Sequence, residues 1–161
     1  MMKLGIYGRF GIILEWSDLD NNDHTWNGNE EEALIMPTEE KTHLILIIDD
    51  EKIVLEAVKD ILEFEGLRIL TAADGQSGID QFRAHQTKID LILLDFSMPG
   101  MSGADTFKVL KEIDPQVKII LSSGYDKAEM TRYFVGQSLA GYLQKPYDLQ
   151  SLVHKIREYL E

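Results

Sequence analysis

Short apolar runs alternate with longer amphipathic segments from residue 42 to the end of the chain. Five runs have the length and composition of strands: residues 43–49, 67–72, 89–94, 117–122 and 140–144. A segment with apolar residues at helical spacing follows each run: residues 51–66, 75–85, 103–113, 126–136 and 148–160. The alternation predicts an α/β fold, in which a five-stranded parallel sheet is doubly wound with helices on both faces.

Helical spacing also predicts which side chains face the sheet. The first helix should bury Val54, Ala57, Val58, Ile61 and Leu62, and should end at Gly66. The second helix should turn Ile79 and Phe82 inward. The last helix should begin after Asp148 as N-cap and bury Leu149, Leu152, Val153, Ile156 and Leu160.

Residues 1–41 lack this regular alternation. The apolar stretch at residues 3–16 predicts a hairpin with its bend near Gly8 or Gly11, and a polar, acidic stretch follows it. We interpret residues 1–41 as an N-terminal extension whose order the sequence leaves open, and residues 42–161 as the main domain. One hypothesis is that the extension inhibits the main domain by docking on it.

Composition narrows the classes of function. The 161-residue chain has a formal net charge of -12, which argues against sequence-independent binding of nucleic acid. It has no cysteine, and no apolar run approaches the roughly 18 residues that span a bilayer. We therefore expect a cytoplasmic protein without disulfides, membrane contact or nucleic-acid contact.

Chemically active residues stand where four of the expected strands end. The first strand ends at Asp49, with Asp50 and Glu51 after it, and the third is followed by Asp95. The fourth ends at Ser122 and the fifth at Lys145. Ligands of open parallel sheets bind outside the carboxyl ends of the strands, so these side chains should meet at one edge.

This set of side chains predicts phosphoryl transfer. Close carboxylates repel one another unless a cation is present, and Mg2+ prefers carboxylate oxygens. Lys145 adds a positive charge that can stabilise a phosphoryl group. Asp95 would be the nucleophile that forms a mixed anhydride, and Ser122 would donate a hydrogen bond to the transferred group.

Four stretches in this order resemble the receiver domain of two-component response regulators. They are LIIDDE (46–51), LILLDFSMPGMSG (91–103), IILSSGYD (119–126) and GYLQKPYD (141–148). The resemblance covers about residues 43–161. The sequence from residue 121 to 160 is most similar to that of receivers in hybrid sensor kinases. The resemblance implies a flavodoxin-like strand order of 2-1-3-4-5, and a cis peptide at Lys145-Pro146.

The same resemblance implies a role for each matching residue. Asp49 and Asp50 correspond to the acidic pair that binds Mg2+, and Asp95 to the phosphoacceptor. Four further positions complete the pattern: Ser97 as the backbone carbonyl ligand of the metal, Ser122 as the switch hydroxyl, Tyr142 as the switch aromatic, and Lys145 as the lysine that contacts the phosphoryl group.

The chain departs from the family pattern at two positions. Ser122 stands where threonine is commoner, and Gly124 stands where some relatives carry a side chain that controls the hydrolytic water. We expect slow self-hydrolysis of the phosphoryl group and no other enzymatic activity. The four histidines, at positions 24, 43, 85 and 154, share no metal-ligand spacing, and we interpret them as surface or linker residues.

The expected partners follow from the resemblance. A histidine kinase or a histidine phosphotransfer protein would donate the phosphoryl group, and a downstream protein target would read the modified state. The alternative is a phosphorylation-independent interaction module that keeps the receiver fold. The sequence leaves the oligomeric state open. It also lacks the G-x-G-x-x-G and P-loop signatures of other folds with this layer pattern.

Overall fold

A computed structural model of the chain describes residues 2–6, 12–16, 42–134 and 139–160. The chain divides into two compact units, Met1–Met36 and Pro37–Glu161. In the first unit, strands β1 (Met2–Ile6) and β2 (Ile12–Trp16) pair antiparallel. The paired strands agree with the expected hairpin, whereas the bend near Gly8 or Gly11 lies outside the described residues. The expected boundary at residue 42 stays a prediction.

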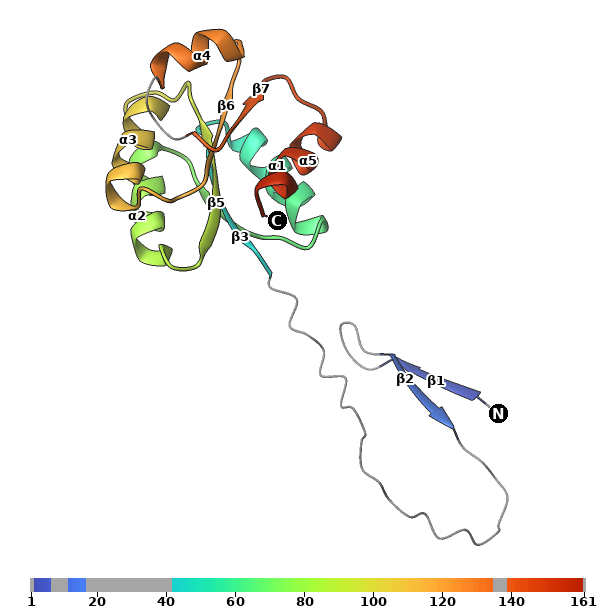
Figure 1. Ribbon diagram of the computed structural model, residues 1–161. Coiled ribbons are helices and arrows are strands. Elements are labelled where there is room, and N and C mark those ends of the chain that lie inside the picture. The colour runs from blue at the N-terminus through green and yellow to red at the C-terminus, as the bar shows by residue number, and fades with distance from the viewer. Residues whose placement is uncertain (1, 7–11, 17–41, 135–138, 161) are drawn as a thin grey trace, which may run out of the picture. The chain divides into compact units, whose positions relative to one another are not determined.

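The second unit is built on a parallel sheet (Figure 1). Its strands are β3 (Leu44–Ile48), β4 (Arg68–Ala72), β5 (Ile89–Asp95), β6 (Ile119–Ser123) and β7 (Gly141–Gln144). They lie in the order β4-β3-β5-β6-β7, and all four pairings are parallel. Counted within this unit the order is 2-1-3-4-5, so the predicted flavodoxin-like topology is confirmed.

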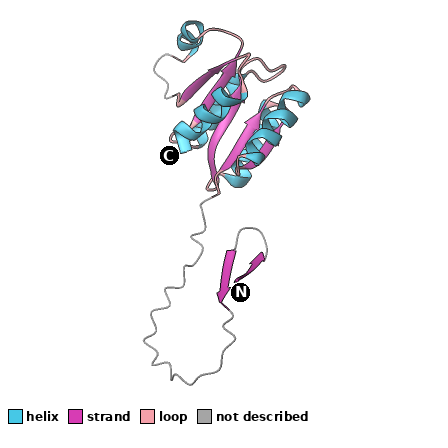
Figure 2. Cartoon of the chain, turned by 90° about the vertical axis from the view of Figure 1, so that its right-hand side faces the viewer, coloured by secondary structure: helices cyan, strands magenta, loops and turns pink. Residues whose placement is uncertain are grey.

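Helices cover both faces of this sheet (Figure 2). They are α1 (Lys52–Phe64), α2 (Gly75–His85), α3 (Gly103–Ile113), α4 (Lys127–Tyr133) and α5 (Leu149–Leu160). Side chains of α1 and α5 share one core with alternate residues of β3, and those of α2, α3 and α4 share the other. The doubly wound arrangement is therefore confirmed. No helix among the described residues is long and apolar enough to cross a membrane.

Full burial explains why the central strands are continuous apolar runs. Every residue of β3 is buried, with Leu46 and Ile48 in one core and Ile45 and Ile47 in the other. Successive side chains of a strand point to opposite faces, so a strand covered on both faces needs apolar residues at every position. The polar residues that interrupt these runs therefore stand at the strand ends.

Two predicted inward residues are exposed, and the reason is geometric. Ala57 of α1 is exposed because it lines an open groove, together with Leu149. Leu149, the first residue of α5, lies in the same groove and is 53% exposed. The predicted helix ends are confirmed: the Ser151 N–H donates to Asp148 Oδ1 at 2.7 Å, and Gly66 has a φ of 83°.

The start of α3 is packed directly against the end of β5. The Gly103 N–H donates to the Phe96 carbonyl at 3.1 Å. A Cβ at Gly103 would lie 2.3 Å from the Asp95 carbonyl oxygen and 2.5 Å from Phe96 Cα, both of which are backbone atoms. Only glycine allows the helix to approach the strand end this closely.

Gly103→Ala should therefore destabilise the fold, although alanine is normally the better helix former. We expect a loss of about 1–3 kcal/mol in the free energy of unfolding, the range of overpacked sites, measured by urea denaturation. Gly124→Ala is the control, because a Cβ there has no neighbour within 4 Å, and it should change stability by about 0.5 kcal/mol or less. Equal stability of the two variants would contradict the close approach.

Candidate functional site

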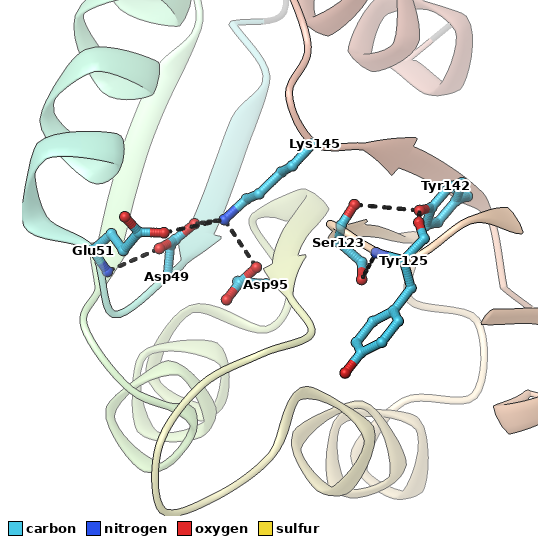
Figure 3. Close-up of polar contacts among 7 residues, drawn as sticks. All are labelled: Asp49, Glu51, Asp95, Ser123, Tyr125, Tyr142 and Lys145. Carbon is cyan, nitrogen blue, oxygen red and sulfur yellow. Dashed lines mark hydrogen bonds and ion pairs between the residues drawn. The ribbon is translucent and has the colours of Figure 1, made fainter. Parts of the chain in front are cut away.

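Two buried carboxylates lie at the carboxyl edge of the sheet. Asp49 directly follows β3 and is 3% exposed, and Asp95 is the last residue of β5 and is 4% exposed. Asp49 Oδ1 accepts a hydrogen bond from the Glu51 N–H at 2.9 Å, which fixes its orientation at the start of α1 (Figure 3). The adjacent central strands thus bring together the two acids that the sequence placed 46 positions apart.

Lys145 reaches these acids from the end of β7, an edge strand of the sheet. It follows β7, and its Nζ lies 2.9 Å from Asp49 Oδ2 and 2.9 Å from Asp95 Oδ1 (Figure 3). Glu51 Oε1 is further away, at 3.9 Å. The Lys145-Pro146 peptide is cis, as the resemblance implied. The predicted meeting of Asp49, Asp95 and Lys145 at one edge is therefore observed.

The acids can also hold a metal ion. Asp49, Asp50 and Asp95 each offer a carboxylate oxygen, and these atoms lie within 4.8 Å of one another. Asp50 is exposed, so the group is open to solvent on one side. Hard oxygen ligands with room for water suit Mg2+. Ser97 is exposed in the loop after β5, and its role as a carbonyl ligand stays a prediction.

The electrostatics of Asp95 and Lys145 differ. Burial raises the pKa of Asp95; the Lys145 ammonium opposes this, and the charges of Asp49 and Asp50 add to it. Burial lowers the pKa of Lys145, but its hydrogen bonds to Asp49 and Asp95 outweigh burial, so the pKa is raised. Two carboxylates stabilise the charged form of Lys145. The charged form of Asp95 is stabilised by one cation and destabilised by two neighbouring acids. The site therefore holds an excess of negative charge that favours a second cation.

Ser122 lies beside Asp95 on the neighbouring strand. The two residues are register partners in the β5–β6 pair, and Ser122 is 2% exposed. Its Oγ is buried and has no hydrogen-bond partner among the described residues. A buried hydroxyl without a partner is costly, so this donor is available for a group that arrives at Asp95.

Tyr142 connects β7 to the loop between β6 and α4. Its hydroxyl donates to the Ser123 carbonyl at 3.3 Å and to the Tyr125 carbonyl (Figure 3). Burial raises its pKa, and Asp126 and Glu129 add to the effect. The phenol is therefore a neutral hydrogen-bond donor. The structure places it next to the loop that follows Ser122, and its role as a switch stays a prediction.

Sequence reasoning missed Tyr147, which directly follows Lys145-Pro146. Burial raises the pKa of its phenol, while the Ser122 hydroxyl and the Lys145 ammonium act to lower it. The two hydroxyls are neighbours, but no hydrogen bond of ordinary geometry joins them. Its position after a strand-end lysine was the only signal in the sequence.

The histidines lie apart from the acidic site where the structure describes them. His43 precedes β3 at the amino end of the sheet, and its Nδ1 is 3.4 Å from Asp90 Oδ1. It is half-buried and lies beside an acid of β5. His85 is also half-buried and contacts the Gln81 carbonyl, whereas His154 is exposed. His24 lies outside the described residues.

The chain belongs to the response regulator receiver domain family, which it matches over residues 45–157. It is similar to the chemotaxis protein CheY of Treponema pallidum, with 28% identity over 73% of this chain and 82% of the relative. It is also 30% identical to the autoinducer 1 sensor kinase/phosphatase LuxN of Vibrio campbellii over 86% of this chain, and spans only 16% of that protein. It spans 48% of the transcriptional regulatory protein YvrH of Bacillus subtilis, at 35% identity.

Solved structures show the same fold. A response regulator receiver domain protein of Clostridium thermocellum superposes with a TM-score of 0.68 at 30% identity, over 73% of this chain and 94% of that one. CheY of Borrelia burgdorferi, in a complex with CheX, BeF3 and Mg, gives a TM-score of 0.68 at 26% identity, over 72% of this chain and 87% of that one. The predicted family is confirmed.

Asp95→Asn should raise the thermal unfolding midpoint of the metal-free protein at pH 7. Burial raises the folded-state pKa of Asp95 above its unfolded value of about 4, so above that pH the native state binds more protons and stability falls as pH rises. Asparagine does not ionise, so the gain should be largest at neutral pH and should vanish near pH 3.

Thermal melts in EDTA across this pH range check the prediction. Asp60→Asn, which removes an exposed acid of α1, is the control and should show no such pH dependence. A lower midpoint of Asp95→Asn at pH 7 would mean that the ion pair with Lys145 outweighs the cost of burial.

Mg2+ should stabilise the protein, and Asp50→Asn should weaken that effect. Binding to the native state alone adds about 1.4 kcal/mol at ten times the dissociation constant. We expect Asp50→Asn to weaken Mg2+ binding at least about tenfold, measured by isothermal titration calorimetry. Asp60→Asn should keep the original affinity, and equal affinities of all three proteins would exclude Asp50 as a ligand.

Proposed function

We propose that residues 42–161 are the phosphoacceptor domain of a two-component or phosphorelay system, and that Asp95 accepts the phosphoryl group from a histidine kinase or a histidine phosphotransfer protein. The observation that carries this proposal is the position of Lys145 Nζ, 2.9 Å from both Asp49 and Asp95. A lysine that bridges two buried acids at the carboxyl ends of parallel strands is the arrangement expected of a phosphoryl-transfer site. Membership of the receiver family supports the same chemistry.

The reaction can be written with the residues of this chain. A carboxylate oxygen of Asp95 attacks phosphorus, the O–P bond forms, and the P–N bond of the donor phosphohistidine breaks, leaving the electron pair on the imidazole nitrogen. Lys145 holds a positive charge beside the phosphoryl oxygens. A magnesium ion held by Asp49, Asp50 and Asp95, with the Ser97 carbonyl as the further predicted ligand, would supply additional neutralisation of negative charge.

Modification of Asp95 would then change contacts at Ser122. The hydroxyl of Ser122 is buried and has no hydrogen-bond partner in the part of the chain that the structure describes, so an acceptor oxygen on Asp95 would give it one. Such a contact exists only in the modified state, and only differential contacts can shift a conformational equilibrium. Tyr142, which bonds the loop after Ser122, would follow, and the surface of α4, β7 and α5 would present a different face to a downstream protein.

The match to LuxN favours a hybrid-kinase setting for this domain. It covers 86% of the chain, whereas the family match covers residues 45–157 only. At least part of residues 1–41 must therefore be included in the similarity to that sensor kinase. We accordingly propose that the phosphoryl donor is a histidine of a sensor kinase, or of a phosphotransfer protein that such a kinase phosphorylates.

Incubation with acetyl phosphate and Mg2+ should convert the protein to a phosphorylated form, seen as a shifted band on a Phos-tag gel. Asp95→Asn should abolish the shift, because the amide is a poor nucleophile. Lys145→Met should slow labelling about 100-fold, because it removes a cation that stabilises the transition state. Asp60→Asn should label at the original rate.

A shift that survives Asp95→Asn would exclude this site. The alternative, a phosphorylation-independent module, predicts a different result: no labelling by acetyl phosphate or by phosphohistidine donors, and no effect of Asp95→Asn on partner binding.

A further inference from the structure

Phe96 is the residue next to Asp95, and its ring faces helix α4. The ring centroid lies 5.9 Å from that of Tyr125, 5.2 Å from Tyr133 and 6.2 Å from Phe134. Phe134 in turn packs edge-on against Phe107 of α3, at 4.9 Å. We call these five residues the aromatic cluster. It joins the phosphoacceptor strand to both ends of α4.

The backbone of Phe96 is fixed on two sides. Its N–H donates to the Ser122 carbonyl at 2.9 Å, and its carbonyl accepts from the Gly103 N–H at 3.1 Å. Phe96 is therefore tied covalently to Asp95 and by a hydrogen bond to Ser122. A change in either residue must change the position from which its ring meets α4.

The residues of the cluster on and beside α4 are less constrained than Phe96. Tyr125 and Tyr133 are 47% and 59% exposed, whereas Phe107 and Phe134 are buried. Helix α4 has only seven residues, and helices this short depend on packing for their position. Phe96 supplies ring contacts at both the start and the end of α4: edge-on with Tyr125 and Phe134, and tilted with Tyr133. The edge-on contacts are directional.

The loop that carries Tyr125 has a second attachment. The Tyr125 N–H donates to Ser123 Oγ at 3.1 Å, and its carbonyl accepts from the Tyr142 hydroxyl. The Tyr125 ring contacts Phe96 while its backbone contacts Tyr142 (Figure 3 shows the backbone contacts). The loop thus receives one connection from the β5 side and another from the β7 side.

We infer that Phe96 is a positioning residue that couples the state of Asp95 to α4 through the aromatic cluster, in parallel with the route through Ser122 and Tyr142. This inference rests on the proposed phosphorylation of Asp95. When the end of β5 adjusts to a phosphoryl group, the Phe96 ring moves against Tyr125 and Tyr133, and α4 changes position with it. The difference in ring contacts between the two states supplies the bias.

Hydrogen–deuterium exchange of the full chain, with and without Mg2+ and BeF3−, tests this coupling. In the unsubstituted protein, exchange should change by at least about threefold over residues 95–103 and over residues 125–134. In Phe96→Leu, which keeps an apolar side chain but removes the ring, the change over residues 95–103 should persist and the change over residues 125–134 should become clearly smaller, because only the route through Ser122 and Tyr142 remains.

Two further variants separate coupling from general destabilisation. Phe96→Tyr keeps the ring and should restore the response of residues 125–134. Phe64→Leu makes the same chemical change at a side chain of α1 that is 90% exposed, and should leave both responses intact. Loss of the α4 response in Phe64→Leu as well would overturn the inference.

The inference fails if Phe96→Leu responds over residues 125–134 as the unsubstituted protein does. Failure of the proposed function is a different result: no response over residues 95–103 in any variant, and no labelling of Asp95 by acetyl phosphate. A labelled Phe96→Leu protein with an unchanged α4 response would therefore reject the coupling alone.

Discussion

One ammonium between two buried carboxylates is the interaction on which the site depends. Burying unpaired charges is expensive, and removal of the Lys145 ammonium would leave both acids without a counter-charge. Lys145 meets Asp49 and Asp95 at equal distances, yet burial and the neighbouring acids still raise the pKa of Asp95. The site is thus neutralised only in part. The proposed magnesium ion would balance the remaining negative charge.

The fold delivers this interaction from distant parts of the chain. Lys145 and Asp49 are 96 positions apart, and only a parallel sheet places the ends of β3, β5 and β7 along a common edge. Both cores of the sheet serve this geometry, since strands with fully buried residues leave little freedom at their ends. Gly103 adds to it, because the missing side chain lets α3 support the backbone of Asp95.

Much of this arrangement was predictable from sequence, and the exceptions have physical causes. Apolar periodicity located the strand ends, and with them the acids and the lysine. The resemblance to a family supplied the strand order. The contacts of Phe96 and Tyr147 were not predictable, because an aromatic residue in a loop carries no sign of the ring it will meet. Ala57 and Leu149 were assigned to the core because spacing locates an apolar stripe but not its edges.

The register of β5 and β6 fixes the distance between the backbones of two site residues. Asp95 and Ser122 are direct partners in neighbouring strands, so their backbones are held about 4.8 Å apart by the hydrogen bonds of the sheet. The ladder crosses the middle of the domain and limits how far either backbone can move. A tetrahedral phosphoryl group on Asp95, as proposed, would therefore meet the Ser122 hydroxyl at a nearly fixed separation.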